Sequence, residues 1–160
     1  MSEAKGRKVV VVTCSGIGKC QGSVIREAAY ELAEELRPQA TEIVALAMLV
    51  LGDEGARRTI ADAPAITIDG CKLMCAAKMV KQSGGTVAEE ATVMDAYRRH
   101  KDLKPEGIAQ LNEAGLKLAR VLAEELAVKV DALTAPTAAA AATGPAAASG
   151  PASAKEVPHA

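Results

Sequence analysis

Apolar runs and amphipathic stretches alternate along most of the chain, and each pattern predicts one kind of element. Residues 8–13 are a β-branched run without polar alternation, which is typical of a strand buried on both faces of a parallel sheet. A glycine-rich loop follows, and over 23–36 apolar residues recur at a spacing of four until an Arg-Pro pair ends the pattern. The start of the chain therefore predicts a buried strand, a loop and a helix packed on a sheet.

The same patterns predict three more strands and three more helices. The strands are expected over 42–46, 65–68 and 86–94, and the helices over 54–61, 73–82 and 106–130. Asp53 is a suitable N-cap for the first of these helices, and Pro105 precedes the last. Strands that alternate with helices indicate an α/β fold with right-handed crossovers. We expect an open, mostly parallel, four-stranded Rossmann-like sheet with flanking helices.

The length of the chain and the composition of its end predict one domain followed by a tail. At 160 residues the chain is long enough for one apolar core and short for two. Its last part consists largely of Ala, Pro, Gly, Thr and Ser, with almost no large apolar side chains to offset the entropy of ordering. We expect an α/β metal-binding domain over 1–133 and a disordered tail over 134–160.

Composition and charge exclude several classes of function. The chain has no Phe, no Trp and two Tyr, and its formal net charge is -1, so it has little with which to stack bases or attract a phosphate backbone. The longest apolar run, 43–51, has nine residues, well short of the roughly 18 that a membrane span requires. The first residues lead directly into a strand and lack a signal-peptide pattern. We therefore expect a cytoplasmic protein that binds neither nucleic acid nor membranes.

The chain has four cysteines, in two pairs that follow predicted strands. Cys14 and Cys20 lie in the loop after the first strand, and Cys71 and Cys75 lie in the loop after the third. In a reducing compartment such cysteines are more readily ligands or reactive thiols than disulfide partners. With the common strand order 2-1-3-4, the first and third strands are neighbours, so their loops meet at the carboxyl edge of the sheet. The topology thus predicts one cluster of four cysteines.

The spacing within the second pair favours zinc. Three residues separate Cys71 from Cys75, within the range of about two to four that is usual between zinc thiolates. If a helix begins near Lys72, its first turn points both sulfurs to the same side. The positive ends of nearby helices and the side chains of Lys19 and Lys72 would offset the charge of the thiolates.

The spacing within the first pair lies outside this range, because five residues separate Cys14 from Cys20. Gly16 and Gly18 allow this loop to fold back, since glycine accepts positive φ without a steric cost. We predict one zinc ion held by all four cysteines, with Cys20 as the ligand that distinguishes a closed site from an open one. Four thiolates also suit an iron–sulfur cluster, and four small buried core residues are the simplest alternative.

A different class of function makes Cys14 a nucleophile. A strand followed by a Gly-rich loop and a helix can cradle oxyanions, as in low-molecular-weight phosphatases and arsenate reductases, which use a Cys-x5-Arg loop. Here Cys20 stands where the arginine would be, and Lys19 lacks the planar fork of a guanidinium. Phosphoryl-carrying IIB domains of phosphotransferase systems fit Cys14 but leave the second pair of cysteines unexplained. The residues leave open whether the protein is an enzyme, and they name no substrate or protein partner.

Two motifs resemble one protein family. The segment 14–18, Cys-Ser-Gly-Ile-Gly, and the segment 68–78, Ile-Asp-Gly-Cys-Lys-Leu-Met-Cys-Ala-Ala-Lys, resemble the DGC-domain family, which is named after the triplet found here at 69–71. The resemblance runs from about residue 8 to about residue 130. It implies that cysteines bind zinc, here Cys14, Cys71 and Cys75, whereas Cys20 has no fixed counterpart in the family pattern. It implies no particular enzymatic activity, and is compatible with a metal-dependent accessory or regulatory protein.

Removal of residues 135–160 is expected to leave the fold and the metal content unchanged, because this segment has no apolar set with which to dock. Circular dichroism, thermal melting and metal analysis of the truncated and full-length proteins test this expectation. Loss of metal or precipitation on truncation would assign the segment to the domain.

Overall fold

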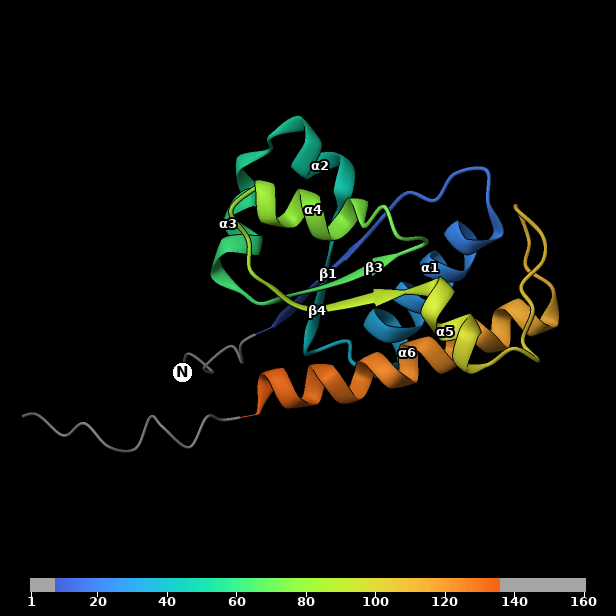
Figure 1. Ribbon diagram of the computed structural model, residues 1–160. Helices are drawn as coiled ribbons and strands as arrows, with labels where there is room; N and C mark the ends of the chain where they lie inside the picture. Colours follow the sequence, from blue (N-terminus) through green and yellow to red (C-terminus); the bar gives the residue numbers. More distant parts are fainter. Residues whose placement is uncertain (1–7, 136–160) are drawn as a thin grey trace, which may run out of the picture.

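The fold is built on a sheet of four parallel strands, seen in a computed structural model that describes residues 8–135 (Figure 1). The strands are β1 (Val9–Thr13), β2 (Thr41–Ala45), β3 (Ala65–Asp69) and β4 (Val87–Thr92), and they lie in the order β2-β1-β3-β4. Adjacent strands all pair in parallel. The predicted α/β class, the open parallel sheet and the neighbouring positions of the first and third strands are therefore confirmed.

Helices cover both faces of this sheet (Figure 1). They are α1 (Cys20–Tyr30), continued by the π-helical turn η1 (Glu31–Leu36), α2 (Leu46–Leu51), α3 (Glu54–Asp62), α4 (Cys75–Gln82), α5 (Val93–Arg99) and α6 (Glu113–Thr134). One apolar core joins the sheet to α1, α5 and α6, and the other joins it to α2, α3 and α4. The molecule thus has three layers, with the sheet in the middle.

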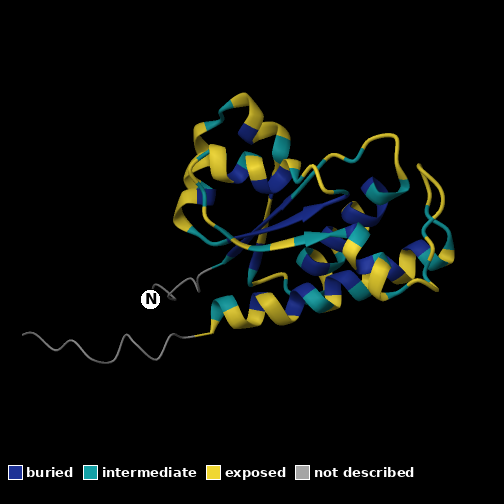
Figure 2. Ribbon diagram, in the orientation of Figure 1, coloured by how far each residue is buried: buried dark blue, intermediate teal, exposed yellow. Residues whose placement is uncertain are grey.

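The central strands are buried because their side chains point alternately into the two cores (Figure 2). Val9 and Val11 enter the core beneath α1 and α6, whereas Val10 and Val12 enter the opposite core. This explains why the run in β1 shows no polar alternation. The residues that follow β1 and β3 lie at the carboxyl edge, where Cys14 packs against both cores.

Capping residues set the ends of several helices, and they correct two predicted boundaries. Asp53 accepts a hydrogen bond from the backbone N–H of Ala56 at 2.8 Å, as expected for α3. The helix expected over 106–130 begins only at Glu113, because Asn112 caps it by accepting from the N–H of Gly115 at 2.8 Å. The strand expected over 86–94 ends at Thr92. The side chain of Thr92 caps α5, so the chain continues as a helix from the next residue.

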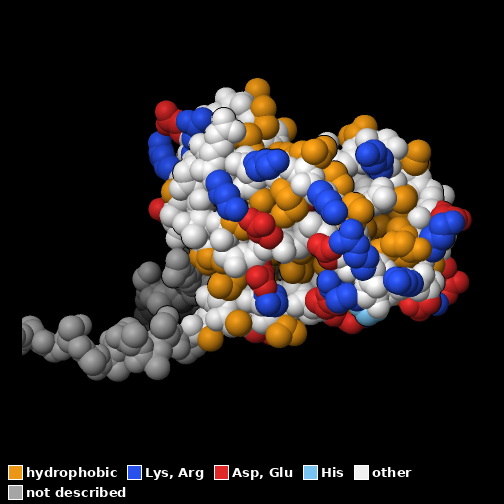
Figure 3. All heavy atoms as spheres, viewed as in Figure 1, with side chains coloured by type: hydrophobic (Ala, Val, Ile, Leu, Met, Phe, Trp, Pro, Cys, Tyr) orange, Lys and Arg blue, Asp and Glu red, His pale blue; other side chains and the backbone are white. Residues whose placement is uncertain are grey.

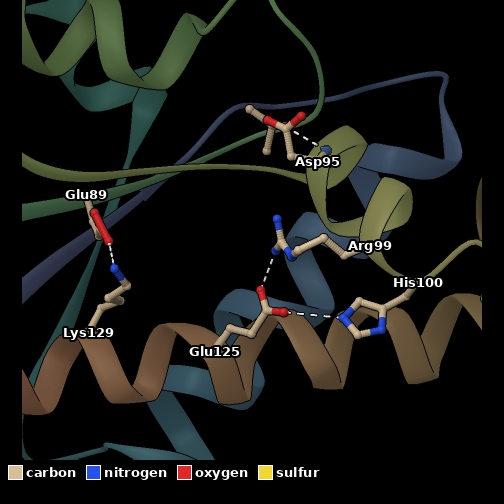
Figure 4. Close-up of polar contacts among 7 residues, drawn as sticks. Glu89, Asp95, Arg99, His100, Glu125 and Lys129 are labelled. Atoms are coloured by element: carbon tan, nitrogen blue, oxygen red, sulfur yellow. Dashed lines mark hydrogen bonds and ion pairs between the residues drawn. The ribbon is translucent and has the colours of Figure 1, made fainter.

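The long helix α6 is held to the rest of the domain by an apolar face and by ion pairs at its sides. Leu118, Leu122 and Leu126 are almost fully buried. Figure 4 shows Glu125 reaching both Arg99 and His100, which follow one another at the end of α5, and Lys129 reaching Glu89 of β4. Near the carboxyl end of α6, Arg37 pairs with both carboxylate oxygens of Asp131 at 2.6 Å. These contacts fix α6 against α1, α5 and the edge of the sheet.

Some predictions concern parts of the chain or properties that the structure does not cover. The helix α6 continues through Thr134, one residue beyond the predicted domain of 1–133, and the rest of the predicted tail, 136–160, lies outside the described residues. Within residues 8–135 no helix is both long and apolar enough to cross a membrane. The cytoplasmic location stays a prediction.

A pair of leucines on α6 tests the packing of this helix. Leu118 is 0% exposed and Leu116 is 48% exposed, so they differ in burial but not in residue type or element. We expect Leu118→Ala to lower the free energy of unfolding by about 2–5 kcal/mol, because it leaves a cavity in the core. Leu116→Ala should change it by about 0.5 kcal/mol or less. Urea denaturation measures both, and equal effects would contradict the packing described.

Candidate functional site

The two cysteine loops meet at the carboxyl edge of the sheet because β1 and β3 are paired. The backbone N–H of Cys14 continues the ladder by donating to the carbonyl of Ile68 at 3.1 Å. The N–H of Gly70 then donates to the Sγ atom of Cys14, with an N-to-S distance of 3.3 Å. The glycine of the Asp-Gly-Cys triplet is thus in direct contact with the first cysteine, although 56 positions separate them in the chain.

The loop after β1 is turned back by a close contact between two glycines. Gly16 has φ +55°, and a Cβ atom placed on it would lie 2.3 Å from the Cα atom of Gly22. A Cβ atom on Gly22 would lie 2.2 Å from the carbonyl oxygen of Gly16, so neither position has room for a side chain. Gly18 has φ +81°. The positive φ expected for Gly16 and Gly18 is confirmed, whereas the role of Gly22 was not apparent from the sequence.

The loop after β3 is organised by the buried carboxylate of Asp69. This side chain is 1% exposed and accepts hydrogen bonds from the N–H groups of Ala76 at 2.8 Å and Ala77 at 3.2 Å. These are first-turn donors of α4, so Asp69 caps the helix from the end of the preceding strand. The helix therefore begins at Cys75, and the expectation that it begins near Lys72 is wrong.

A turn occupies the segment that was expected to be the start of this helix. The N–H of Met74 donates to the carbonyl of Cys71 at 3.2 Å, and Met74 itself has φ +53°, in the left-handed region. Cys71 and Cys75 are consequently not successive positions on one helical face. Cys71 lies in the turn and is partly buried, while Cys75 opens α4 and is exposed.

Three of the four cysteines lie within electrostatic range of one another. Burial raises the pKa of the Cys14 thiol, the hydrogen bond from Gly70 opposes this rise, and the negative charge of Asp69 adds to it. Thiolate charge at Cys75 and at Cys71 raises the pKa of Cys14 further.

Cys20 stands apart from this group. It is the first residue of α1, and its thiol donates to the Oε1 atom of Gln21 at 3.6 Å. It is not among the groups that act on the pKa of Cys14. Within residues 8–135, no three His, Cys, Asp or Glu side chains are grouped closely enough to hold a metal ion. The structure therefore brings both loops to one edge, and the four-cysteine cluster itself stays a prediction.

A hollow of about 280 Å³ opens on one side of Cys14, towards α1 and β2. Ser15, Arg26 and Tyr30 are among the residues that line it. The Nη2 atom of Arg26 donates to the hydroxyl of Ser23 at 3.2 Å. Among residues 8–135, the guanidinium that lines this hollow thus comes from α1, and the loop that carries Cys14 contributes none.

Comparison with known proteins identifies the family. Residues 10–115 match the family model described as the DGC domain, and the match includes both cysteine loops. No curated protein and no solved structure matches the chain. Because the match spans more than half of the 160 residues and includes the Asp-Gly-Cys triplet at 69–71, the chain belongs to the DGC domain family.

Proposed function

We propose that the protein binds one zinc ion through thiolates at the carboxyl edge of the sheet and acts as a metal-dependent accessory or regulatory protein. The contact between the N–H of Gly70 and the sulfur of Cys14 carries the proposal, because it joins the two cysteine loops at one place. The ligands would be Cys14, Cys71 and Cys75, with Cys20 as the fourth. Thiolates in this number are the donors that structural zinc sites prefer.

The donor set fits zinc in its chemistry. Asp69 is occupied as the cap of α4, since both of its carboxylate oxygens accept backbone N–H groups, so the sulfurs are the donors left at this edge. Cys75 is exposed and Cys71 lies in a turn, and the charge of each acts on the Cys14 thiol. When bound, zinc would keep these thiols deprotonated and crosslink the two loops.

Partner binding is consistent with the surface around the cysteines. Ile17 is 82% exposed and Leu73 is 65% exposed, and each lies in one of the two cysteine loops. Figure 3 shows hydrophobic side chains among Lys and Arg side chains over α4 and towards the carboxyl end of the sheet. An accessory protein that regulates or delivers metal would contact its partner beside this site, and exposed apolar side chains there are available for such a contact.

The alternative with Cys14 as a nucleophile has less support. A catalytic cysteine of the phosphatase type has a depressed thiol pKa and an arginine within its loop. Burial instead raises the pKa of Cys14, and Arg26, which lines the hollow beside it, extends from the second turn of α1. We therefore favour a role as metal ligand for this thiol.

The first test is the metal content of protein purified without oxygen. We expect about one zinc per chain and a colourless solution, because thiolate sulfur prefers zinc and zinc has no visible charge-transfer bands. Elemental analysis and an absorption spectrum measure this. Removal of the metal by a chelator should lower the melting temperature, since binding to the folded form is linked to stability. Stoichiometric iron with visible bands would instead assign an iron–sulfur cluster, and a metal-free protein would refute the proposal.

The second test asks whether Cys20 is the fourth ligand. Cys71→Ser should release zinc, because a hydroxyl oxygen is a much poorer ligand than a thiolate, and Cys20→Ser should weaken zinc retention to a similar extent. Ser15→Ala, in the same loop, is the matched control and should retain zinc. X-ray absorption on the wild type should count four sulfurs. A first shell of three sulfurs and one light atom would exclude Cys20 and leave an open coordination position, which is typical of catalytic zinc.

A further inference from the structure

A second hollow lies near the carboxyl edge of the sheet, and no cysteine lines it. Its volume is about 310 Å³, and it is formed by the first turn of α1, by α5 and by the segment that leads to α6. Figure 1 shows α5 beside the start of α1 and the loop before α6 at the same end of the molecule. The lining residues are Gln21, Val93, Met94, Tyr97, Arg98 and Pro105. In open parallel sheets this edge is where ligands bind.

The lining of this hollow is apolar except for two side chains. Val93, Met94 and Pro105 contribute aliphatic and thioether groups, and Tyr97 contributes the ring of one of the two aromatic residues in the chain. Such a lining favours a flat or branched apolar group, since thioethers and aromatic rings both contact rings favourably. A hollow of 310 Å³ is at the lower end of the size of ligand sites, which begin at about 300 Å³. It suits one ring with a short substituent.

The two polar side chains of the lining offer hydrogen-bond donors. The Oε1 atom of Gln21 already accepts from the thiol of Cys20, which leaves its amide N–H groups for a ligand. The Nη1 atom of Arg98 donates to Asp95 at 2.5 Å, and its remaining N–H groups meet no acceptor among residues 8–135. Asp95 is in turn held by the hydroxyl of Thr92 at 2.8 Å. The hollow therefore offers N–H donors to whatever enters it, while Asp95 already pairs with the charge of Arg98.

We propose that this hollow binds a small organic carboxylate whose apolar body is about the size of one aromatic ring. The apolar body would contact Met94 and Tyr97, and the carboxylate would accept from Arg98 and Gln21. A guanidinium and an amide are good partners for a carboxylate, because both present N–H groups and neither adds negative charge. This inference goes beyond the proposed metal site, since no cysteine lines the hollow.

The hollow is nevertheless joined to the cysteine edge through Gln21. A Cβ atom placed on Gly70 would lie 3.3 Å from the Cβ atom of Gln21, so the glycine of the Asp-Gly-Cys triplet packs directly on this side chain. The same glycine donates its N–H to Cys14. A ligand in the hollow would thus be one side chain away from the residues that organise the proposed metal site.

Titration of the full-length protein with phenylacetate, followed by two-dimensional NMR, tests the proposal. We expect saturable shifts that include the amide of Gln21 and the methyl group of Met94. Arg98→Gln should weaken binding about tenfold, because it removes a charge-assisted hydrogen bond. Met94→Asp should weaken it at least as much, since a carboxylate in the lining repels the ligand. The matched control is Val128→Asp on α6, where the side chain is 65% exposed and lies outside the hollow, and it should leave binding unchanged.

Comparison with phenylacetamide separates the carboxylate from the apolar body. The neutral amide should bind about tenfold more weakly, because it lacks the charge that Arg98 would meet. Equal binding of the two compounds, absence of saturable shifts, or binding insensitive to both Arg98→Gln and Met94→Asp would overturn the proposal. Titrations with and without bound metal keep this result independent of zinc binding, since the hollow should bind phenylacetate in both states.

Discussion

The cysteine edge of this domain depends on one buried carboxylate, which caps the helix that follows it. Asp69 ends β3 inside the protein, where an unpaired charge would be costly, and its two oxygens are satisfied by the first N–H groups of α4. The same contact fixes the residue at which α4 begins and therefore the length of the turn between Cys71 and Cys75. The backbone positions of both cysteines thus follow from a hydrogen-bonding requirement in the core.

Much of the fold follows from local patterns in the chain. The uninterrupted valines of β1 indicate burial on both faces, and Asp53 has the residue type and position of an N-cap, so both features were predictable. The start of α6 was not predictable in this way, since Pro105 is an equally plausible first-turn residue. Asn112 is the cap in the structure, and it also receives the backbone N–H of Glu106 on its side chain, which holds the preceding loop in a non-helical path.

The meeting of the two cysteine loops was predictable, and the contacts that shape each loop were less so. The topology brings Cys14 beside the Asp-Gly-Cys triplet because strand order alone dictates which loops are neighbours. Spacing could not reveal that Asp69 caps α4 across six intervening residues, since that contact depends on tertiary structure. The need for glycine at position 22 comes likewise from the return of the preceding loop onto α1, and a lone glycine inside a helix gives no sign of it.

The position of α6 has a consequence for relatives of this chain. The family match ends at residue 115, within the first turn of the helix, yet the leucines that close one core come after that point. Without α6, part of the core formed by the sheet, α1 and α5 would face water. A family member that lacks an equivalent of α6 must shield this face in another way, with a helix from elsewhere in its sequence or with a second polypeptide. The matched segment would then supply the two cysteine loops, while the cover over this core could differ from one member to another.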